Sequence, residues 1–104
     1  MNIVVKSINF NANTALTEFV RKKVGKLFNH FSHIIRAHVV LRERENGSLK
    51  NRQCTIMLEV PGNDHIVEKQ AEVHEKSVLQ AVEALQKILR RKKTRLIAAR
   101  QISY

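Results

Sequence analysis

The spacing of apolar residues switches repeatedly along this chain between the two-residue period of a strand and the longer period of a helix, which sharply restricts the possible folds. The clearest alternation runs over residues 35–42, where apolar residues are interleaved with mostly basic ones. A strand of this composition has one face against a core and one face toward solvent. Its core face is expected to hold Ile35, Ala37, Val39 and Leu41.

Three other segments alternate in the same way, over residues 3–10, 54–60 and 65–73. We predict a strand in each, because β-branched residues with a two-residue period are typical of half-buried strands. The residues that share one parity, and are expected to face the core, are Val4, Ile8 and Phe10 in the first segment, Cys54, Ile56, Leu58 and Val60 in the second, and Val67, Ala71 and Val73 in the third.

Turn sequences separate the last three predicted strands. Asn46-Gly47 supplies residues that accept the positive backbone dihedrals of a tight hairpin. Pro61-Gly62-Asn63-Asp64 is a second turn signal. We therefore expect these strands to pair antiparallel with their neighbours in sequence.

Two segments have helical spacing. Asn13 or Thr14 can cap the first helix, whose apolar residues from Leu16 to Phe31 recur at three- and four-residue intervals. Ser77 and Gln80 have the spacing of a capping box, so the second helix is expected to begin there. Its predicted core stripe contains Val78, Val82, Leu85, Leu89 and Leu96, with Ala81 and Ile88 beside it. Lys87, Arg90, Arg91 and Arg95 fall on the opposite side.

These elements predict an α+β fold with the order βαβββα, in which a four-stranded sheet carries two helices packed on one face. The 104-residue length fits one domain, assigned to residues 1–98, followed by a short C-terminal tail over residues 99–104.

Positive charge indicates the class of partner. The chain has 19 Lys and Arg against 9 Asp and Glu, a formal net charge of +10. An ordinary solvated face mixes signs, whereas residues 84–104 contain seven basic residues and no acidic one, which favours a nucleic acid as the partner. The four Phe residues fit core positions, so we expect structured RNA bound through phosphates and shape. The predicted contacts are Lys22, Lys26, Arg36, Arg42, Lys87, Arg90, Arg91 and Arg95, with Arg21 and Arg44 contributing to the same basic surface.

The sequence offers no support for catalysis, a metal site or a cofactor. Cys54 is the only cysteine, and the histidines lack ligand partners at metal-binding spacing. The three glycines stand apart and form no phosphate-binding loop, and Glu68 and Glu72 suggest an exposed strand face rather than an acid and base pair. Without an apolar run of membrane-spanning length or a signal peptide, the protein is expected to be cytoplasmic. We also expect it to be monomeric when free.

Several strings in sequence order resemble the ribosome hibernation and sigma-54 modulation protein family over residues 1–98. They are Met1-Asn2-Ile3, the segment 13–20 (NTALTEFV), the run 24–31 with the strand end Val39-Val40-Leu41, and Ala71-Glu72 onward through 78–83 (VLQAVE). The family usually has an acidic cluster with Asp at the last helix cap and a Tyr shortly after, where this chain has His74-Glu75-Lys76-Ser77 and Leu79.

This resemblance implies a factor that binds ribosomal RNA in the cleft of the small ribosomal subunit, blocks the sites of transfer RNA and messenger RNA, and silences translation reversibly. Whether such a protein promotes or opposes ribosome pairing stays open. A rival hypothesis is a protein-interaction module that regulates a transcription factor, with the basic surface meeting an acidic protein.

Overall fold

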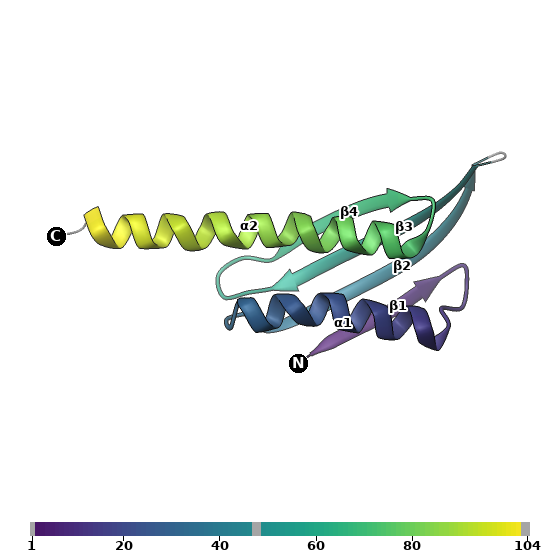
Figure 1. Ribbon diagram of the computed structural model, residues 1–104, viewed down its shortest axis with the longest axis horizontal. Helices are drawn as coiled ribbons and strands as arrows, with labels where there is room; N and C mark the ends of the chain where they lie inside the picture. The colour runs from purple at the N-terminus through teal and green to yellow at the C-terminus, as the bar shows by residue number, and fades with distance from the viewer. Residues whose placement is uncertain (1, 47–48, 103–104) are drawn as a thin grey trace.

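A computed structural model describes the backbone of residues 2–46 and 49–102, and the side chains of residues 2–44 and 51–91. Its elements are β1 (Ile3–Ile8), α1 (Thr14–His30), β2 (Arg36–Asn46), β3 (Leu49–Glu59), β4 (His65–Ala71) and α2 (His74–Ile102) (Figure 1). The predicted order βαβββα is confirmed. Residues 99–102, assigned to a tail from the sequence, continue α2.

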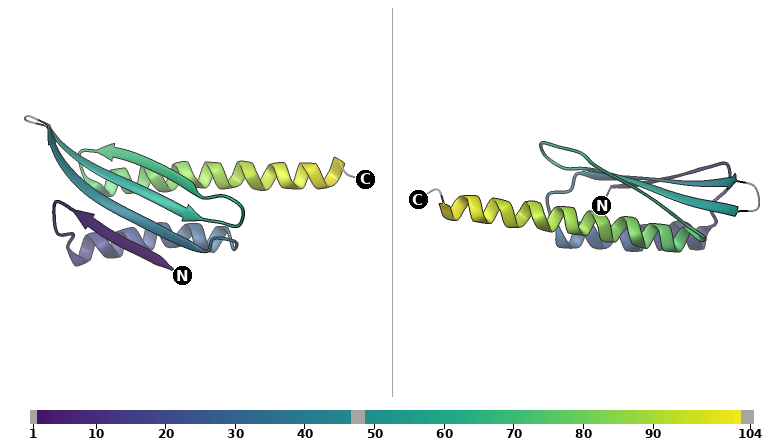
Figure 2. Two further views of the ribbon diagram at one scale, coloured as in Figure 1. Left: turned by 180° about the vertical axis from the view of Figure 1, so that it is seen from behind. Right: turned by 90° about the horizontal axis from the view of Figure 1, so that it is seen from above.

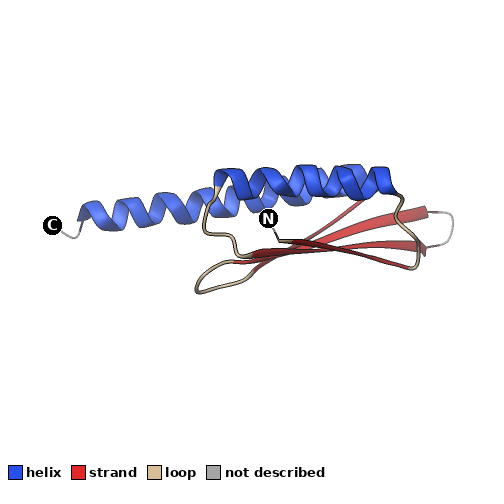
Figure 3. Ribbon diagram, turned by 90° about the horizontal axis from the view of Figure 1, so that it is seen from below, coloured by secondary structure: helices blue, strands red, loops and turns tan. Residues whose placement is uncertain are grey.

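The four strands form one sheet in the order β1-β2-β3-β4. β1 pairs parallel with β2, which requires a crossover connection, and α1 provides it. β2, β3 and β4 pair antiparallel, as predicted from the turn sequences. Both helices cover the same face of the sheet and run in the same direction (Figures 2 and 3). We call the uncovered side the open face and the two helices together the helix layer.

The core lies between the sheet and the helix layer. Alternate residues of β2 and β3 face the helices and are fully or almost fully buried, namely Ala37, Val39, Leu41, Cys54, Ile56 and Leu58. Buried residues of the helices pack against them, namely Leu16, Val20, Val24 and Leu27 of α1 and Val78, Ala81, Leu85 and Leu89 of α2. The predicted burial of Cys54 is confirmed, and burial raises the pKa of its thiol to about 12.

The prediction of which side of β1 faces the core is wrong. Ile3 is buried and Val5 packs on the core, whereas Val4 and Ile8 lie exposed on the other side. Both parities of this segment are apolar, so alternation alone could not choose between them. Phe10 reaches the core from beyond the strand end, after Asn9 adopts a positive φ of 70°.

Two other residues that were predicted from the alternation to face the core lie just outside strands and are exposed. Ile35 precedes β2 and is exposed, while its neighbour Ile34 is buried. Val73 follows the end of β4 and is also exposed. A two-residue period holds only while the backbone is extended and paired, so parity could not be carried past Arg36 or Ala71.

The predicted start of α1 is confirmed, and the predicted start of α2 is wrong. The Asn13 side chain accepts a hydrogen bond of 2.8 Å from the Leu16 amide, as expected of an N-cap. α2 begins at His74, three residues earlier than the Ser77 and Gln80 spacing predicted. Ser77 lies inside the first turn, where its hydroxyl donates to the His74 carbonyl at 2.9 Å. It is therefore not a cap.

The turn after β3 has the predicted chemistry. The Asn63 amide donates to the Val60 carbonyl at 3.3 Å, closing a four-residue turn with Pro61 and Gly62 in the middle. Gly62 has φ +93°, the left-handed value that the third position of a type II turn requires. At the other hairpin, Asn46 pairs with Leu49, and Gly47 of the predicted turn lies outside the described residues.

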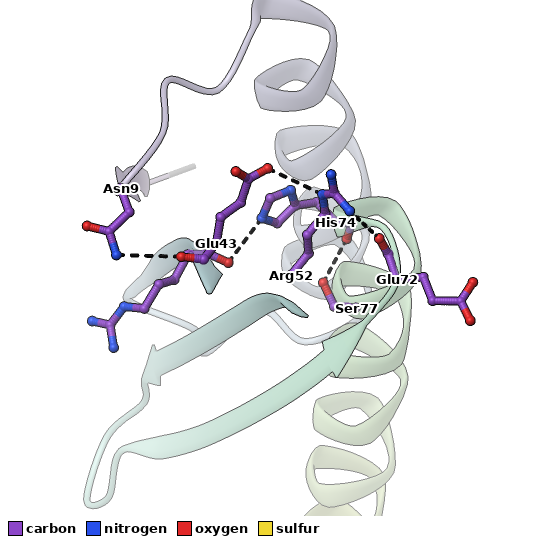
Figure 4. A network of polar contacts seen from close by, with 7 residues as sticks. Asn9, Glu43, Arg52, Glu72, His74 and Ser77 are labelled. Carbon is purple, nitrogen blue, oxygen red and sulfur yellow. Dashed lines mark hydrogen bonds and ion pairs between the residues drawn. The ribbon is translucent and has the colours of Figure 1, made fainter. Parts of the chain in front are cut away.

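A polar junction fixes the start of α2 against the sheet (Figure 4). The buried His74 ring stacks on Phe10 with 4.6 Å between centroids, and its Nε2 donates to the Arg42 carbonyl at 3.3 Å. Arg52 contacts the Glu43 carboxylate at 3.3 Å and donates to the Glu72 carbonyl at 2.6 Å. The junction thus joins β2, β3, the loop after β1 and the first turn of α2.

We expect His74 to make the fold less stable in acid. Burial lowers its pKa below the ordinary 6.5, even though the Arg42 carbonyl and Glu43 act in the opposite direction. The stability that neutral His74 contributes is complete above pH 6.5 and is lost as the pH falls toward the lowered pKa of the folded state. Urea unfolding of the His74→Phe variant, which keeps a ring on Phe10, should depend less on pH between neutral and mildly acidic conditions. Replacing exposed His33 with Asn should leave the wild-type slope unchanged.

Candidate nucleic-acid interface

The cations of α1 are concentrated on the side of the helix away from the core. Lys22 and Lys26 are both exposed, as predicted, and are one helical turn apart. Lys23 lies between them in sequence, with its Nζ 5.6 Å from the centre of the Phe19 ring. The nearby charge of Lys26 is the main cause of a lowered Lys23 pKa, with a smaller effect from Lys22. Like charges on this helix therefore repel one another, and an anion would relieve the repulsion.

The second helix presents cations on its outer side as well. Lys87, Arg90 and Arg91 are exposed, as the sequence predicted. Lys87 also forms an ion pair of 3.6 Å with Glu83, one turn earlier. Glu83 lies just before residues 84–104, the segment without acidic residues, so this cation does have a counter-charge. The Arg95 side chain, the fourth predicted contact on α2, lies outside the described residues. Where side chains are described, α2 thus exposes these three predicted cations and also Lys76, in its first turn.

A groove between β4 and α2 brings a further cation to this surface. It has a volume of about 440 Å³ and is lined by Lys69, Gln80, Glu83, Ala84, Lys87, Ile88 and Arg91. Lys69 was missed from the sequence, because it shares the core-facing parity of Val67 and Ala71 in β4. An inward-pointing lysine on an edge strand protects against strand aggregation, and that unusual parity was the available signal. In the folded protein the Lys69 side chain lines the groove together with Lys87 and Arg91.

Arg36 and Arg42, the remaining predicted contacts, do not lie on the helix layer. Arg36 and Arg42 alternate with the buried residues of β2, so their side chains project from the open face. Arg36 Nη1 lies 3.9 Å from the Glu59 carboxylate. Arg21, on α1, uses its guanidinium to donate to the Ile3 carbonyl at 3.0 Å and so holds β1. The structure thus divides the predicted basic surface between two faces.

Within the described part of the chain, no group of three His, Cys, Asp or Glu residues could hold a metal ion. Neither helix, over its described residues, is long and apolar enough to cross a bilayer.

The fold and the exposed cations define a small α+β module with a basic helix layer. Comparison with known families then identifies it: residues 3–97 match the family described as Sigma 54 modulation protein / S30EA ribosomal protein, and the chain belongs to this family. The resemblance noted from the sequence is confirmed. Membership supports association with the ribosome.

Solved structures share the fold. A ribosomal subunit interface protein from Coxiella burnetii superposes with a TM-score of 0.78 at 18% identity, covering 90% of this chain and 99% of that one. The N-terminal domain of Protein Y from Thermus thermophilus gives a TM-score of 0.76 at 24% identity, covering 88% and 98%. No significant match was found among curated protein sequences.

The groove generates a prediction about Lys69. Replacing it with Glu should weaken binding to double-stranded RNA by about tenfold, because one phosphate contact is lost and a repulsive charge is added beside Lys87 and Arg91. Electrophoretic mobility shift at fixed salt would measure the change. Exposed Lys76, in the first turn of α2 and not among the groove residues, provides the matched control, and Lys76→Glu should have a much smaller effect. Equal losses for the two variants would exclude the groove as a contact.

Proposed function

We propose that this protein is a non-enzymatic ribosome hibernation factor that binds small-subunit ribosomal RNA through its helix layer and blocks the sites of messenger RNA and transfer RNA. One observation carries the proposal: α1 and α2 lie side by side on one face of the sheet (Figure 1), and both expose cations on the side away from the core. Family membership supports the ribosome as the partner.

Binding would be driven by phosphates. Each Lys or Arg that neutralises a phosphate releases condensed counterions, which favours association without reading a base sequence. The contacts on this layer are Lys22, Lys26, Lys87, Arg90 and Arg91, with Lys69 at the groove and Arg95 further along α2. A complex held by such contacts involves no covalent step, so the inhibition is reversible.

Shape supports the blocking role. The backbone is elongated, with extents of 59 × 27 × 18 Å, and α2 continues well past the end of the sheet (Figure 1). An elongated cationic body can fill a channel that otherwise admits RNA. Arg36 and Arg42 face the other way and are left out of this contact.

Charge reversal on the two faces tests the proposal. The triple variant Lys22→Glu, Lys26→Glu and Arg91→Glu should remain folded, because each exposed change costs within about 0.5 kcal/mol. Its affinity for small ribosomal subunits should fall by at least about 100-fold, since every former phosphate contact becomes repulsive. Co-sedimentation with purified subunits at moderate salt provides the measurement, and circular dichroism checks the fold.

The matched control makes the same change of charge on the open face, with Lys6→Glu, Arg42→Glu and Arg44→Glu. This variant should lose much less affinity, because only long-range attraction is reduced. If both triple variants lost affinity equally, Arg42 and its neighbours would belong to the RNA contact. If the helix-layer variant co-sedimented like wild type, the proposed RNA surface would be wrong.

Salt dependence gives an independent prediction. The logarithm of the association constant should fall linearly with the logarithm of salt concentration, with a slope of about −0.9 for each duplex RNA phosphate neutralised, taking the value for a DNA duplex. Replacing a single contact such as Lys26 with Gln should reduce the slope by about one. An affinity for small subunits that did not change with salt would contradict binding through phosphates.

A further inference from the structure

The open face of the sheet carries an apolar hollow that the proposed RNA contact does not use. Its volume is about 320 Å³, and it is lined by Val4, Lys6, His38, Val39, Val40, Thr55, Met57 and Ile66. The strand register explains its continuity, because Val4 lies opposite His38, His38 opposite Met57, and Met57 opposite Ile66. One row of side chains therefore crosses all four strands. We call this feature the sheet hollow.

The apolar side chains of the sheet hollow are unusually accessible. Val4 is 42% exposed and Ile66 is 65% exposed. A sheet face that contacts only solvent usually carries polar residues instead. Single exposed apolar residues are ordinary, but a contiguous apolar patch with a polar rim is typical of an interaction site. The sheet hollow has both the patch and the rim.

The rim is mainly positive. Lys6 lines the sheet hollow, and Arg42 and Arg44 follow Val40 on the same face of β2. Among the described side chains no acidic residue forms an ion pair with these three cations. Glu68, opposite Thr55 in the register, is an exposed acidic residue of the same face. Glu59 is engaged by two neighbours, with its carboxylate 3.9 Å from Arg36 and 3.1 Å from His38. A partner that covers this face would therefore need negative charge.

The side chains of the open face favour one class of negatively charged partner over the others. Single-stranded nucleic acids bind sheet faces by stacking bases on aromatic rings, and the sheet hollow has only the His38 ring. The Phe residues are on the helix side, where they pack on the core. A second copy of this chain, placed face to face, would bring like charges together. An acidic protein segment satisfies both the apolar lining and the positive rim.

We propose that the open face docks an acidic protein segment that inserts an aliphatic side chain into the sheet hollow and sets its carboxylates against Lys6 and Arg42. The helix layer stays free for RNA, because the two surfaces lie on opposite sides of the sheet (Figure 3). The protein would then be a two-sided adaptor that holds an acidic protein and RNA at the same time.

A synthetic peptide of alternating Glu and Leu serves as the probe. Nuclear magnetic resonance of the labelled full chain should show shifts of the amides of Val4, Val40, Met57 and Ile66 as the peptide is added. Two matched peptides, one with Ser for Leu and one with Lys for Glu, should leave these amides unchanged. Oligouridylate should shift amides of the helices instead. If the Glu-Leu peptide left the open face unchanged, or if oligouridylate shifted it more strongly, the proposal would be overturned.

Variants locate the site. Ile66→Ser should weaken peptide binding by about tenfold, the loss expected from removing one buried aliphatic side chain. Lys6→Glu tests the rim separately and should also weaken binding. Ile35→Ser is the matched control, because Ile35 is likewise exposed, at 52%, but does not line the sheet hollow.

Co-sedimentation of Ile66→Ser with small ribosomal subunits separates this proposal from the RNA contact. The fraction of Ile66→Ser that co-sediments with the subunits should equal that of wild type, even if the helix layer proved not to bind RNA. Loss of ribosome binding in this variant would assign the open face to the ribosome contact. Equal peptide affinities for Ile66→Ser and Ile35→Ser would show that the sheet hollow is not the docking site.

Discussion

Burial of alternate residues of β2 and β3 against two helices is the constraint on which the rest of this structure depends. Ala37, Val39 and Leu41 are between 0% and 1% exposed, and their partners in β3 are buried equally. A shift of register by one residue would send these side chains into solvent and bring arginines into the core, at a large cost in free energy. The register of β2 thereby fixes where the neighbouring strands and both helices lie.

The same alternation separates the charges of the protein. Once Ala37 and Leu41 face the helices, Arg36 and Arg42 must face away from them, on the side where no helix packs. The cations of the helices point outward for the corresponding reason, since the stripes containing Val20 and Leu85 are buried. Two basic surfaces with different surroundings result. One is formed by lysines and arginines on the helices, and the other lies around apolar side chains on the sheet.

The junction around His74 links the two surfaces. It holds the first turn of α2 against β2 and β3, through a buried ring and through the Arg52 contacts with Glu43 and Glu72. Because α2 is anchored at this end, its direction along the sheet is set before its basic half begins. Lys87 and Arg91 can then meet Lys69 of β4 at one groove, although Lys69 and Lys87 are 18 positions apart in the sequence.

The sequence by itself determined the order of elements, the stripes of both helices, the burial of Cys54 and the basic character of the surface, because these depend on local periodicity and composition. It could not decide which parity of β1 is buried, since both are apolar, or that α2 begins at His74, since that start depends on contacts with Phe10 and Arg42. Only the tertiary structure separated Arg36 and Arg42 from Lys22 and Lys26. Charge is counted along the chain, but the face on which each charge lies depends on which side of the sheet the helices cover.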